Sequence, residues 1–290
     1  SFEEEEKAEE DRYASSMTDF ESILTAFSAF PHVALHWHYR SKSEELIRFS
    51  NHYYYGGNLV TFPSAQLKRE GFGVDFCYVP GVYDRTHRTN EAEASKIAEL
   101  VYHDCYLKRR DKSVGIIAFN TSQQELIQDK IDEMAEKDQD FAAYLAGDYQ
   151  RDPLFVKNLE TCQGDERDII YFSICFAPDR NGRFLLSFGP LSQAGGERRL
   201  NVAITRAKEN LVVVSSIHYT DLDPDRMESV GGKRLREYLR FAENDTLEEE
   251  RKNIESNALS SFNEEIASFL KEHGIAFDTM VGTASHRIDI

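Results

Sequence analysis

The chain has 290 residues, 41% of them hydrophobic, enough for one large domain or two ordinary ones with a sizeable core. No apolar run approaches the roughly 20 residues of a membrane span, and no basic-then-apolar leader opens the sequence, so a membrane protein is excluded. The net charge of −17 argues against an extended basic surface. The four cysteines are far apart with no metal-ligand spacing, which favours reduced thiols and a cytoplasmic location.

The acidity is concentrated at the two ends. Residues 1–30 hold nine acids against two bases, and residues 241–290 hold eleven against four, so each end carries a net charge of −7. The middle, residues 31–240, carries only −3. A near-neutral middle can present a local basic groove, although bulk charge alone would not hold a nucleic acid tightly.

Apolar periodicity predicts strands that alternate with helices along most of the chain. The expected strands cover residues 33–37, 73–79, 114–119, 155–159, 169–176, 184–188 and 211–215. The expected helices cover residues 20–27, 41–55, 90–110, 123–137, 198–207 and 231–242. In the helix over 41–55, Ser41 is the expected N-cap and Gly56-Gly57 the expected stop. This alternation predicts an α/β fold whose parallel sheet is covered on both faces.

The same pattern suggests four segments. Residues 1–17 form an acidic loop, residues 18–242 the α/β domain and residues 243–257 a polar linker. Residues 258–290 open a second, small α/β domain, with a helix over 259–273 and strands over 275–281 and 287–290. Both ends of the sequence are abrupt, and we interpret them as domain cuts.

The first segment with chemical potential is Trp37-His38-Tyr39-Arg40-Ser41, at a strand-to-helix junction. An arginine there can meet a phosphate, and the amides of the helix N-terminus add further donors. Alternatively, Arg40 satisfies nearby carboxylates. We expect this segment and the next two at the carboxyl ends of the strands, where α/β sheets bind ligands.

The second segment, Thr161 to Asp168, lies between two predicted strands. Gly164 permits a tight turn, and the polar side chains around it can bind sugar hydroxyls or backbone phosphates. The alternative is an ordinary surface turn, which this segment alone does not exclude.

The third segment, Gly195 to Lys208, contains three arginines within nine residues, beside a glycine turn. This pattern indicates an anion site, with a solvated basic face as the alternative. The apolar residues between the arginines require the helix to dock, which restricts where the arginines point.

Together, and in this order, the three segments resemble the carboxyl-terminal motor motifs of superfamily 1 helicases, in the branch that includes the RNA-surveillance helicases. Residues 36–58 look like motif IV, 163–168 like motif V and 199–207 like motif VI. The resemblance covers about residues 20–242 and implies a three-layer RecA-like domain of the P-loop NTPase type. It is nearest to large bacterial helicases with a nuclease-like carboxyl-terminal domain.

The resemblance implies a nucleotide site for ATP. Arg206 resembles the motif VI arginine finger on the γ-phosphate, and Arg40 resembles a second finger in motif IV; such groups stabilise charge in the transition state. Tyr39 matches an aromatic that stacks on the base, and Glu166 matches an acid near the ribose. Gln163 and Gly164 match the turn that couples nucleotide to strand.

The resemblance also implies a contact with single-stranded nucleic acid. The strand that ends at Phe119 is followed by a loop that matches the one between motifs IV and V in the family. In this loop Asn120, Thr121 and Gln123 are the expected contacts to the nucleic-acid backbone.

Half of an ATP site is missing from the sequence. There is no GxxxxGK[ST] motif, since Gly231-Gly232-Lys233 is followed by Arg234 and lacks the upstream glycine, and no Asp-Glu pair follows a buried strand. ATP and Mg²⁺ would therefore be held mostly by an amino-terminal RecA-like domain outside this sequence. We expect the present chain alone not to hydrolyse ATP.

The tail from Leu259 resembles the start of a PD-(D/E)xK or very-short-patch-repair-like nuclease, a truncated restriction-endonuclease-like domain. Glu265 on its helix, with Glu264 as the alternative, and Asp289 in its last strand are the expected metal ligands of an incomplete Mg²⁺ site. By analogy this tail favours DNA over RNA.

The expected function is the carboxyl-terminal motor domain of a bacterial ATP-dependent DNA helicase or translocase. Two alternatives stay open. One is a nucleic-acid-binding module without turnover, and the other is a helicase-nuclease whose main activity is DNA cleavage.

Overall fold

The computed structural model describes residues 27, 29–31, 33, 35–61, 71–147, 152–184, 186–245, 247, 261–275, 281–283 and 286–288. The chain separates into two units, Ser1–His36 and Trp37–Ile290, and all the helices and strands named below belong to the second. The predicted acidic loop of residues 1–17 lies outside the described residues, as does the predicted helix over 20–27 except for Phe27. No described helix is long and apolar enough to cross a membrane.

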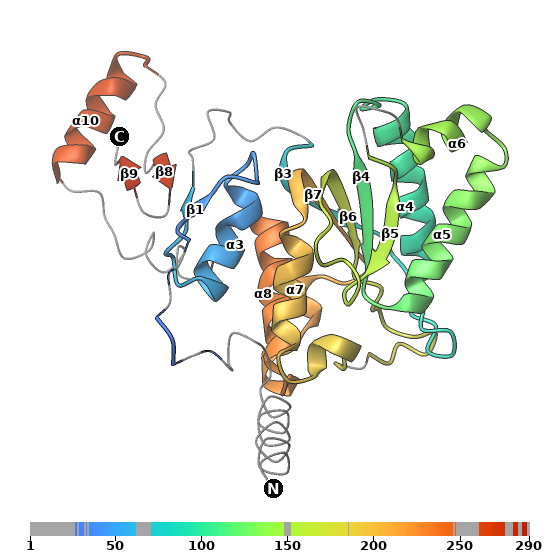
Figure 1. Cartoon of the computed structure of the whole chain (residues 1–290). Coiled ribbons are helices and arrows are strands. Elements are labelled where there is room, and N and C mark those ends of the chain that lie inside the picture. Colours follow the sequence, from blue (N-terminus) through green and yellow to red (C-terminus); the bar gives the residue numbers. More distant parts are fainter. Residues whose placement is uncertain are drawn as a thin grey trace, which may run out of the picture. The chain divides into compact units, whose positions relative to one another are not determined.

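A five-stranded sheet in the order β3-β7-β6-β4-β5 forms the centre of the second unit (Figure 1). Its strands are β3 (Gly73–Tyr78), β4 (Val114–Ala118), β5 (Phe155–Asn158), β6 (Arg167–Ser173) and β7 (Ala207–Ser215). Every neighbouring pair is parallel, which confirms the predicted parallel sheet. All amino ends of the strands therefore meet at one edge, the amino edge, and all carboxyl ends meet at the opposite carboxyl edge. A separate parallel pair joins β1 (Trp37–His38) to β2 (Val60–Thr61).

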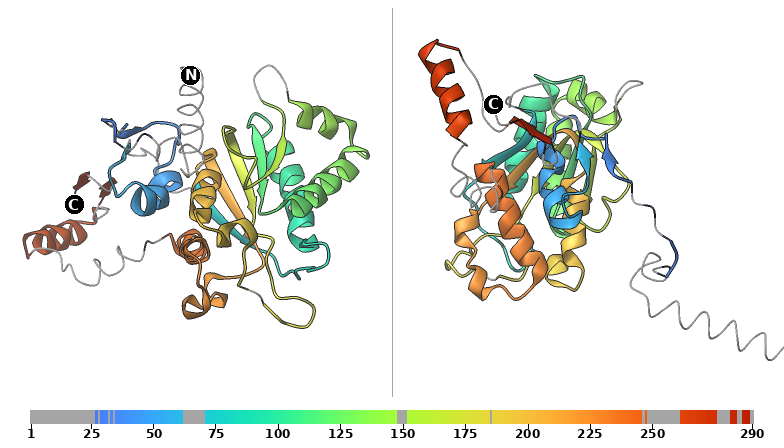
Figure 2. Two further views of the ribbon diagram at one scale, coloured as in Figure 1. Left: turned by 60° about the horizontal axis from the view of Figure 1, so that its bottom comes forward. Right: turned by 90° about the vertical axis from the view of Figure 1, so that its left-hand side faces the viewer.

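Helices cover both faces of the sheet, so the predicted three-layer architecture is confirmed (Figures 1 and 2). One face carries α3 (Glu45–Tyr54), α7 (Gly196–Ile204) and α8 (Val230–Asn244). The other carries α4 (Glu91–Leu100) with its π-helical continuation Val101–Tyr106, α5 (Thr121–Ala135) and α6 (Gln139–Ala146). Side chains of β4 and β6 alternate between two apolar cores, with Ile117 and Phe172 in the first and Ile116 and Tyr171 in the second. The continuous apolar runs of these strands exist because both of their faces are buried.

Two predicted strands are wrong. The described residues of the segment 184–188 form no strand. Its apolar residues are used for packing instead: Phe188 is fully buried and lies edge-on against Phe176, with ring centroids 5.2 Å apart. A 3-10 helix, Gly189–Ser192, follows. Of the described residues in the strand expected over 33–37, only Trp37 belongs to a strand.

The predicted N-cap of α3 is also wrong. The hydroxyl of Ser41 lies 2.9 Å from Nε2 of His38, so it is engaged by the preceding strand. The helix begins at Glu45, and the N-cap residue Glu44 makes no side-chain capping bond. The predicted stop is confirmed, since Gly56 and Gly57 follow the helix with φ of 60° and 74°.

The end of the main domain and the tail complete the described elements. Two 3-10 turns, Tyr219–Asp221 and Pro224–Arg226, lead into α8, which continues past the predicted boundary at residue 242. The tail contains α10 (Ser261–Glu272) and an antiparallel pair, β8 (Val281–Thr283) and β9 (His286–Ile288). The order of helix, strand and strand agrees with the predicted one, but β8 shares only Val281 with the strand predicted over 275–281.

Candidate functional site

A charged cluster lies at the amino edge of the sheet. Glu166 directly precedes β6, Arg206 directly precedes β7, and Lys208 is the second residue of β7. The segment after β1 adds Arg40, whose Nε lies 2.7 Å from Oε2 of Glu166. Nζ of Lys208 lies 3.1 Å from Oε1 of the same carboxylate. The fold thus brings the predicted residues Arg40 and Glu166 into direct contact beside Arg206.

The prediction that these residues lie at the carboxyl ends of the strands is wrong, because the cluster lies at the amino edge. The chain crosses from the end of β5 to the start of β6 without a helix, so Glu166 belongs to the beginning of the next strand. Similarly, α7 ends at Ile204 and the chain turns directly into β7. Both motifs therefore sit at the amino edge.

The guanidinium of Arg206 is folded back onto the end of α7. Its Nε donates to the carbonyl of Val202 at 2.7 Å, and Nη2 donates to Oγ1 of Thr205 at 3.2 Å. Burial, followed by repulsion from Arg40, lowers the pKa of Arg206. Within the described residues Arg206 has no ion pair, so a half-buried cation faces a second cation and would be stabilised by an anion.

Glu166 carries the only negative charge among these four residues. Burial alone would raise the pKa of Glu166, but the hydrogen bond from Lys208 and the nearby arginines outweigh it, so the pKa is lowered. One carboxylate thus balances three cations, Arg40, Arg206 and Lys208. The remaining positive charge suits a ligand with several anionic oxygens, such as a polyphosphate.

The loop that carries Arg40 is fixed to the start of β7. The backbone N–H of Lys42 donates to the carbonyl of Lys208 at 2.7 Å. Nζ of Lys42 lies 2.6 Å from Oε1 of Glu209, which Nζ of Lys112 also contacts at 2.9 Å. These bonds hold Arg40 beside the cluster, and sequence reasoning missed them because the three partners are far apart in the chain.

The other predicted nucleotide residues are accessible. Tyr39 is 84% exposed, so its ring is open to a stacking partner. Gln163 and Gly164 are exposed as well, and Gly164 has a φ of 92°, a left-handed conformation that favours glycine. Lys208 was missed as a site residue, although its position directly after motif VI was the available signal.

The predicted nucleic-acid residues lie at the opposite, carboxyl edge. Asn120 follows β4 and caps α5 by accepting the N–H of Gln123 at 2.9 Å. Oγ1 of Thr121 lies 3.3 Å from Nδ2 of Asn158, at the end of β5. Thr121 is exposed and Asn120 partly exposed, so both can meet a strand that runs along this edge.

The structure corrects the prediction that Gln123 contacts nucleic acid. Its side chain is fully buried, and its amide accepts from the N–H of Asn90 at 2.8 Å and donates to the carbonyl of Asn90 at 3.1 Å. With both ends of the amide engaged inside the fold, Gln123 cannot contact a nucleic acid here. Its role is to support the loop that presents Asn120 and Thr121.

A buried carboxylate, Glu93 in α4, organises the carboxyl edge. It accepts hydrogen bonds from the hydroxyl of Ser173 at 2.7 Å, the N–H of Cys175 at 2.7 Å and the N–H of Ser216 at 2.8 Å. Burial outweighs these bonds and raises the pKa of Glu93 to about 7. The network joins the ends of β6 and β7 to the start of α4.

The predicted metal ligands of the tail lie where the structure describes no side chains. Asp289 lies outside the described residues, and Glu265 lies in α10, where only the backbone is described. Among the residues whose side chains are described, no group of three His, Cys, Asp or Glu residues is arranged to hold a metal. The nuclease-like metal site stays a prediction.

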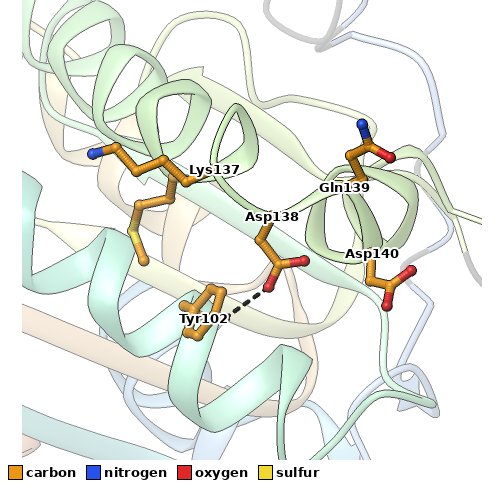
Figure 3. A pocket seen from close by; sticks show the side chains of 6 residues that line it. Tyr102, Lys137, Asp138, Gln139 and Asp140 are labelled. Atoms are coloured by element: carbon orange, nitrogen blue, oxygen red, sulfur yellow. Dashed lines mark hydrogen bonds between the residues drawn. The ribbon is translucent and has the colours of Figure 1, made fainter.

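A hollow of about 540 Å³ lies on the helical layer of α4 to α6 (Figure 3). Tyr102 donates its hydroxyl hydrogen to Oδ2 of Asp138 at 2.8 Å on its wall. The hollow contains none of the predicted site residues. Exposed Lys137 at its margin follows the end of α5 that is far from Asn120, and it serves below as a control position.

The chain matches one family model and is similar to several proteins named as helicases. A family model described as AAA domain matches residues 15–218. The uncharacterized ATP-dependent helicase MG140 of Mycoplasma genitalium is 36% identical over 219 residues, covering 72% of this chain and 18% of that protein. Its homolog in Mycoplasma pneumoniae is 36% identical over 214 residues, with the same coverage. The putative helicase mov-10-B.2 of Danio rerio is 32% identical over 166 residues, covering 52% of this chain and 15% of that protein.

The chain thus spans less than a fifth of the length of the Mycoplasma relatives. Solved structures give weak likenesses. T. fusca Cas3 has a TM-score of 0.27 at 15% identity, covering 54% of this chain and 19% of that one. The E. coli DExH-box NTPase HrpB has a TM-score of 0.29 at 11% identity, covering 61% and 25%. At these scores the likeness adds nothing to the sheet topology described above.

Proposed function

Because the chain belongs to the AAA domain family, whose model spans residues 15–218, we propose that it is the second RecA-like motor domain of a superfamily 1 helicase. In this role it supplies arginine fingers to an ATP site shared with a first RecA-like domain. The observation that carries the proposal is the meeting of Arg40 and Arg206 beside Glu166 at the amino edge. The relatives named as ATP-dependent helicases support it.

The cluster fits the triphosphate of ATP. Arg206 and Arg40 would contact the γ-phosphate, Glu166 the ribose, and exposed Tyr39 the base. Arg40 is bonded to Glu166 in the structure, so ATP binding requires it to exchange a carboxylate for phosphate oxygens. That exchange is favourable because the phosphate carries more charge and because Arg206 has no ion pair within the described residues.

Mg²⁺ fits this cluster poorly. Glu166 is its only carboxylate, and both oxygens are already engaged by Arg40 and Lys208. We therefore place the metal ligands and the phosphate-binding loop on the first RecA-like domain. The arginines stabilise the charge that develops on the transferred phosphoryl group only when the two domains close.

The nucleic-acid strand is proposed to lie along the carboxyl edge, against Asn120 and Thr121. The middle of the chain is nearly neutral, so binding by this domain alone should be weak and strongly salt-dependent. We propose DNA as the substrate on the resemblance of the tail to nuclease folds, an argument by analogy.

The test is the ATPase activity of the full-length protein, in which we place the first RecA-like domain. Arg206→Ala and Arg40→Ala should each lower nucleic-acid-stimulated kcat, by roughly 10³–10⁵ for an arginine finger. The double variant should be less than additive, because both groups act on one transition state. Lysine at either position should restore little, since it keeps the charge but loses the planar fork.

Two controls make the result specific. Lys137→Ala removes an exposed cation beside the hollow in Figure 3 and should leave kcat unchanged. Binding of a fluorescent ATP analogue should persist in both arginine variants. Turnover near the unaltered rate in either arginine variant, or equal losses in the control, would refute the assignment.

A further inference from the structure

Two loops at the carboxyl edge, outside every motif assigned so far, carry a group of arginines. We name these the basic rim, and it consists of Arg85, Arg88, Arg180 and Arg183, in residues 84–89 and 179–183. The two loops are fastened together. Nε of Arg85 lies 3.0 Å from Oδ2 of Asp179, and Nη2 of Arg85 donates to the carbonyl of Arg183 at 3.0 Å. Residues that are distant in sequence therefore form one surface.

The rim has an excess of positive charge. Its four arginines face two aspartates within these loops, and both aspartates are engaged. Asp84 accepts from Nδ1 of His87 at 2.9 Å, and Asp179 pairs with Arg85. Arg88, Arg180 and Arg183 are exposed and have no ion pair within the described residues. In a chain of net charge −17, three exposed guanidinium groups without such an ion pair give this edge a local positive charge, which favours an anion.

The position of Arg88 joins the rim to the predicted strand contacts. The carbonyl of Arg88 accepts from Nδ2 of Asn120 at 3.1 Å and from Sγ of Cys175 at 3.6 Å. Arg88 and Cys175 both have left-handed backbones, with φ of 59° and 70°. Such conformations at non-glycine residues persist only where the surroundings enforce them, and they gather at functional sites. At Cys175 the surroundings include Glu93, which accepts the backbone N–H at 2.7 Å.

We infer that the basic rim binds the sugar-phosphate backbone of a single-stranded nucleic acid and extends the contact surface of Asn120 and Thr121. Arg88, Arg180 and Arg183 contact phosphates, to which a guanidinium can donate two parallel hydrogen bonds. Arg85 is a positioning residue, because its guanidinium holds the two loops together. The inference rests on the proposed function and adds residues that the helicase motifs do not contain.

The salt dependence of binding tests this surface. Fluorescence anisotropy of the 290-residue chain with a labelled single-stranded oligonucleotide, measured over a salt series, gives the slope of log affinity against log salt. Each phosphate contact to a single strand contributes about 0.7 to this slope. The triple variant Arg88→Gln, Arg180→Gln, Arg183→Gln should therefore lose up to about 2 from the slope, together with affinity.

The matched control is Lys137→Gln, which removes an exposed positive charge after the far end of α5 and should leave the slope unchanged. The single variant Arg183→Gln, which keeps the left-handed Arg88 intact, guards against misfolding and should lose about 0.7. An unchanged slope in a folded triple variant overturns only the inference that the basic rim contacts phosphates. Absence of any binding by the unaltered chain at low salt overturns the rim together with the proposed strand contacts. In either case the ATPase test of the arginine fingers is unaffected.

Discussion

Replacing Glu93 by glutamine should change how the stability of the domain responds to pH. Glu93 is fully buried and has no basic hydrogen-bond partner among those described. Its partners are the hydroxyl of Ser173, the N–H groups of Cys175 and Ser216, and the side-chain amide of Asn90. Burial raises its pKa from 4.5 to about 7. The neighbouring thiol of Cys175 has its own pKa raised, so it stays protonated near neutral pH and adds no charge.

The sign of the effect follows from the raised pKa. The folded protein holds the proton of Glu93 more tightly than the unfolded chain does, so the stabilisation is complete below pH 4.5 and is lost as the pH rises through about 7. A difference of about 2.5 between the two pKa values corresponds to about 3 kcal/mol in the free energy of unfolding.

Urea denaturation at a series of pH values, from about 4 to about 8.5, measures this loss. Glutamine cannot ionise, so the profile of Glu93→Gln contains every other titrating group and serves as the reference. The difference in unfolding free energy between the two proteins should fall by about 3 kcal/mol towards high pH. Parallel profiles would show that Glu93 stays ionised in the fold, held by its four hydrogen-bond donors, and would refute the reasoning.

Two further predictions concern single positions. In the full-length protein, Lys208→Met should raise the KM for ATP and reduce the preference for ATP over 2′-deoxy-ATP, because Lys208 positions the proposed ribose ligand Glu166. Its effect on kcat should be smaller than that of Arg206→Ala. An unchanged preference would contradict this role. Gly231→Ala should destabilise the fold by about 1–3 kcal/mol, because its Cβ would collide with the backbone carbonyl of Leu191. Gly232→Ala, which meets mainly the side chains of Ser229 and Phe188, is the matched control and should cost less in urea denaturation.

The sheet was predictable because its central strands are apolar throughout. The runs from Val114 and Ile169 indicated strands buried on both faces, and the structure places them side by side in β4 and β6. The apolar segment 184–188 led to a wrong strand prediction. Phe184 and Phe188 pack against each other from a loop. Local pattern alone cannot separate these two cases, because both bury large apolar groups.

The candidate site was only partly predictable. Arg40, Glu166 and Arg206 were identified from motifs, but their edge of the sheet depends on whether a helix separates Glu166 from the preceding strand, which the sequence did not show. Gln123 was misjudged because a polar residue near a helix start can either face solvent or support a loop from inside. The basic rim escaped notice because its two halves are joined only by tertiary contacts such as that between Arg85 and Asp179.

The proposed ATP site and the proposed nucleic-acid contacts lie at opposite edges of the sheet, which has a mechanical consequence for the motor. The nine residues of β7 run from the arginine cluster at one edge to the Glu93 network at the other. At about 3.3 Å per residue they form a stiff beam roughly 26 Å long. A tilt of about 8° about its arginine end would sweep the far end through about 3.4 Å, the rise of one nucleotide. A small closure of the two domains around a phosphate is thus enough to move the nucleic-acid edge by one base, with little deformation of the sheet.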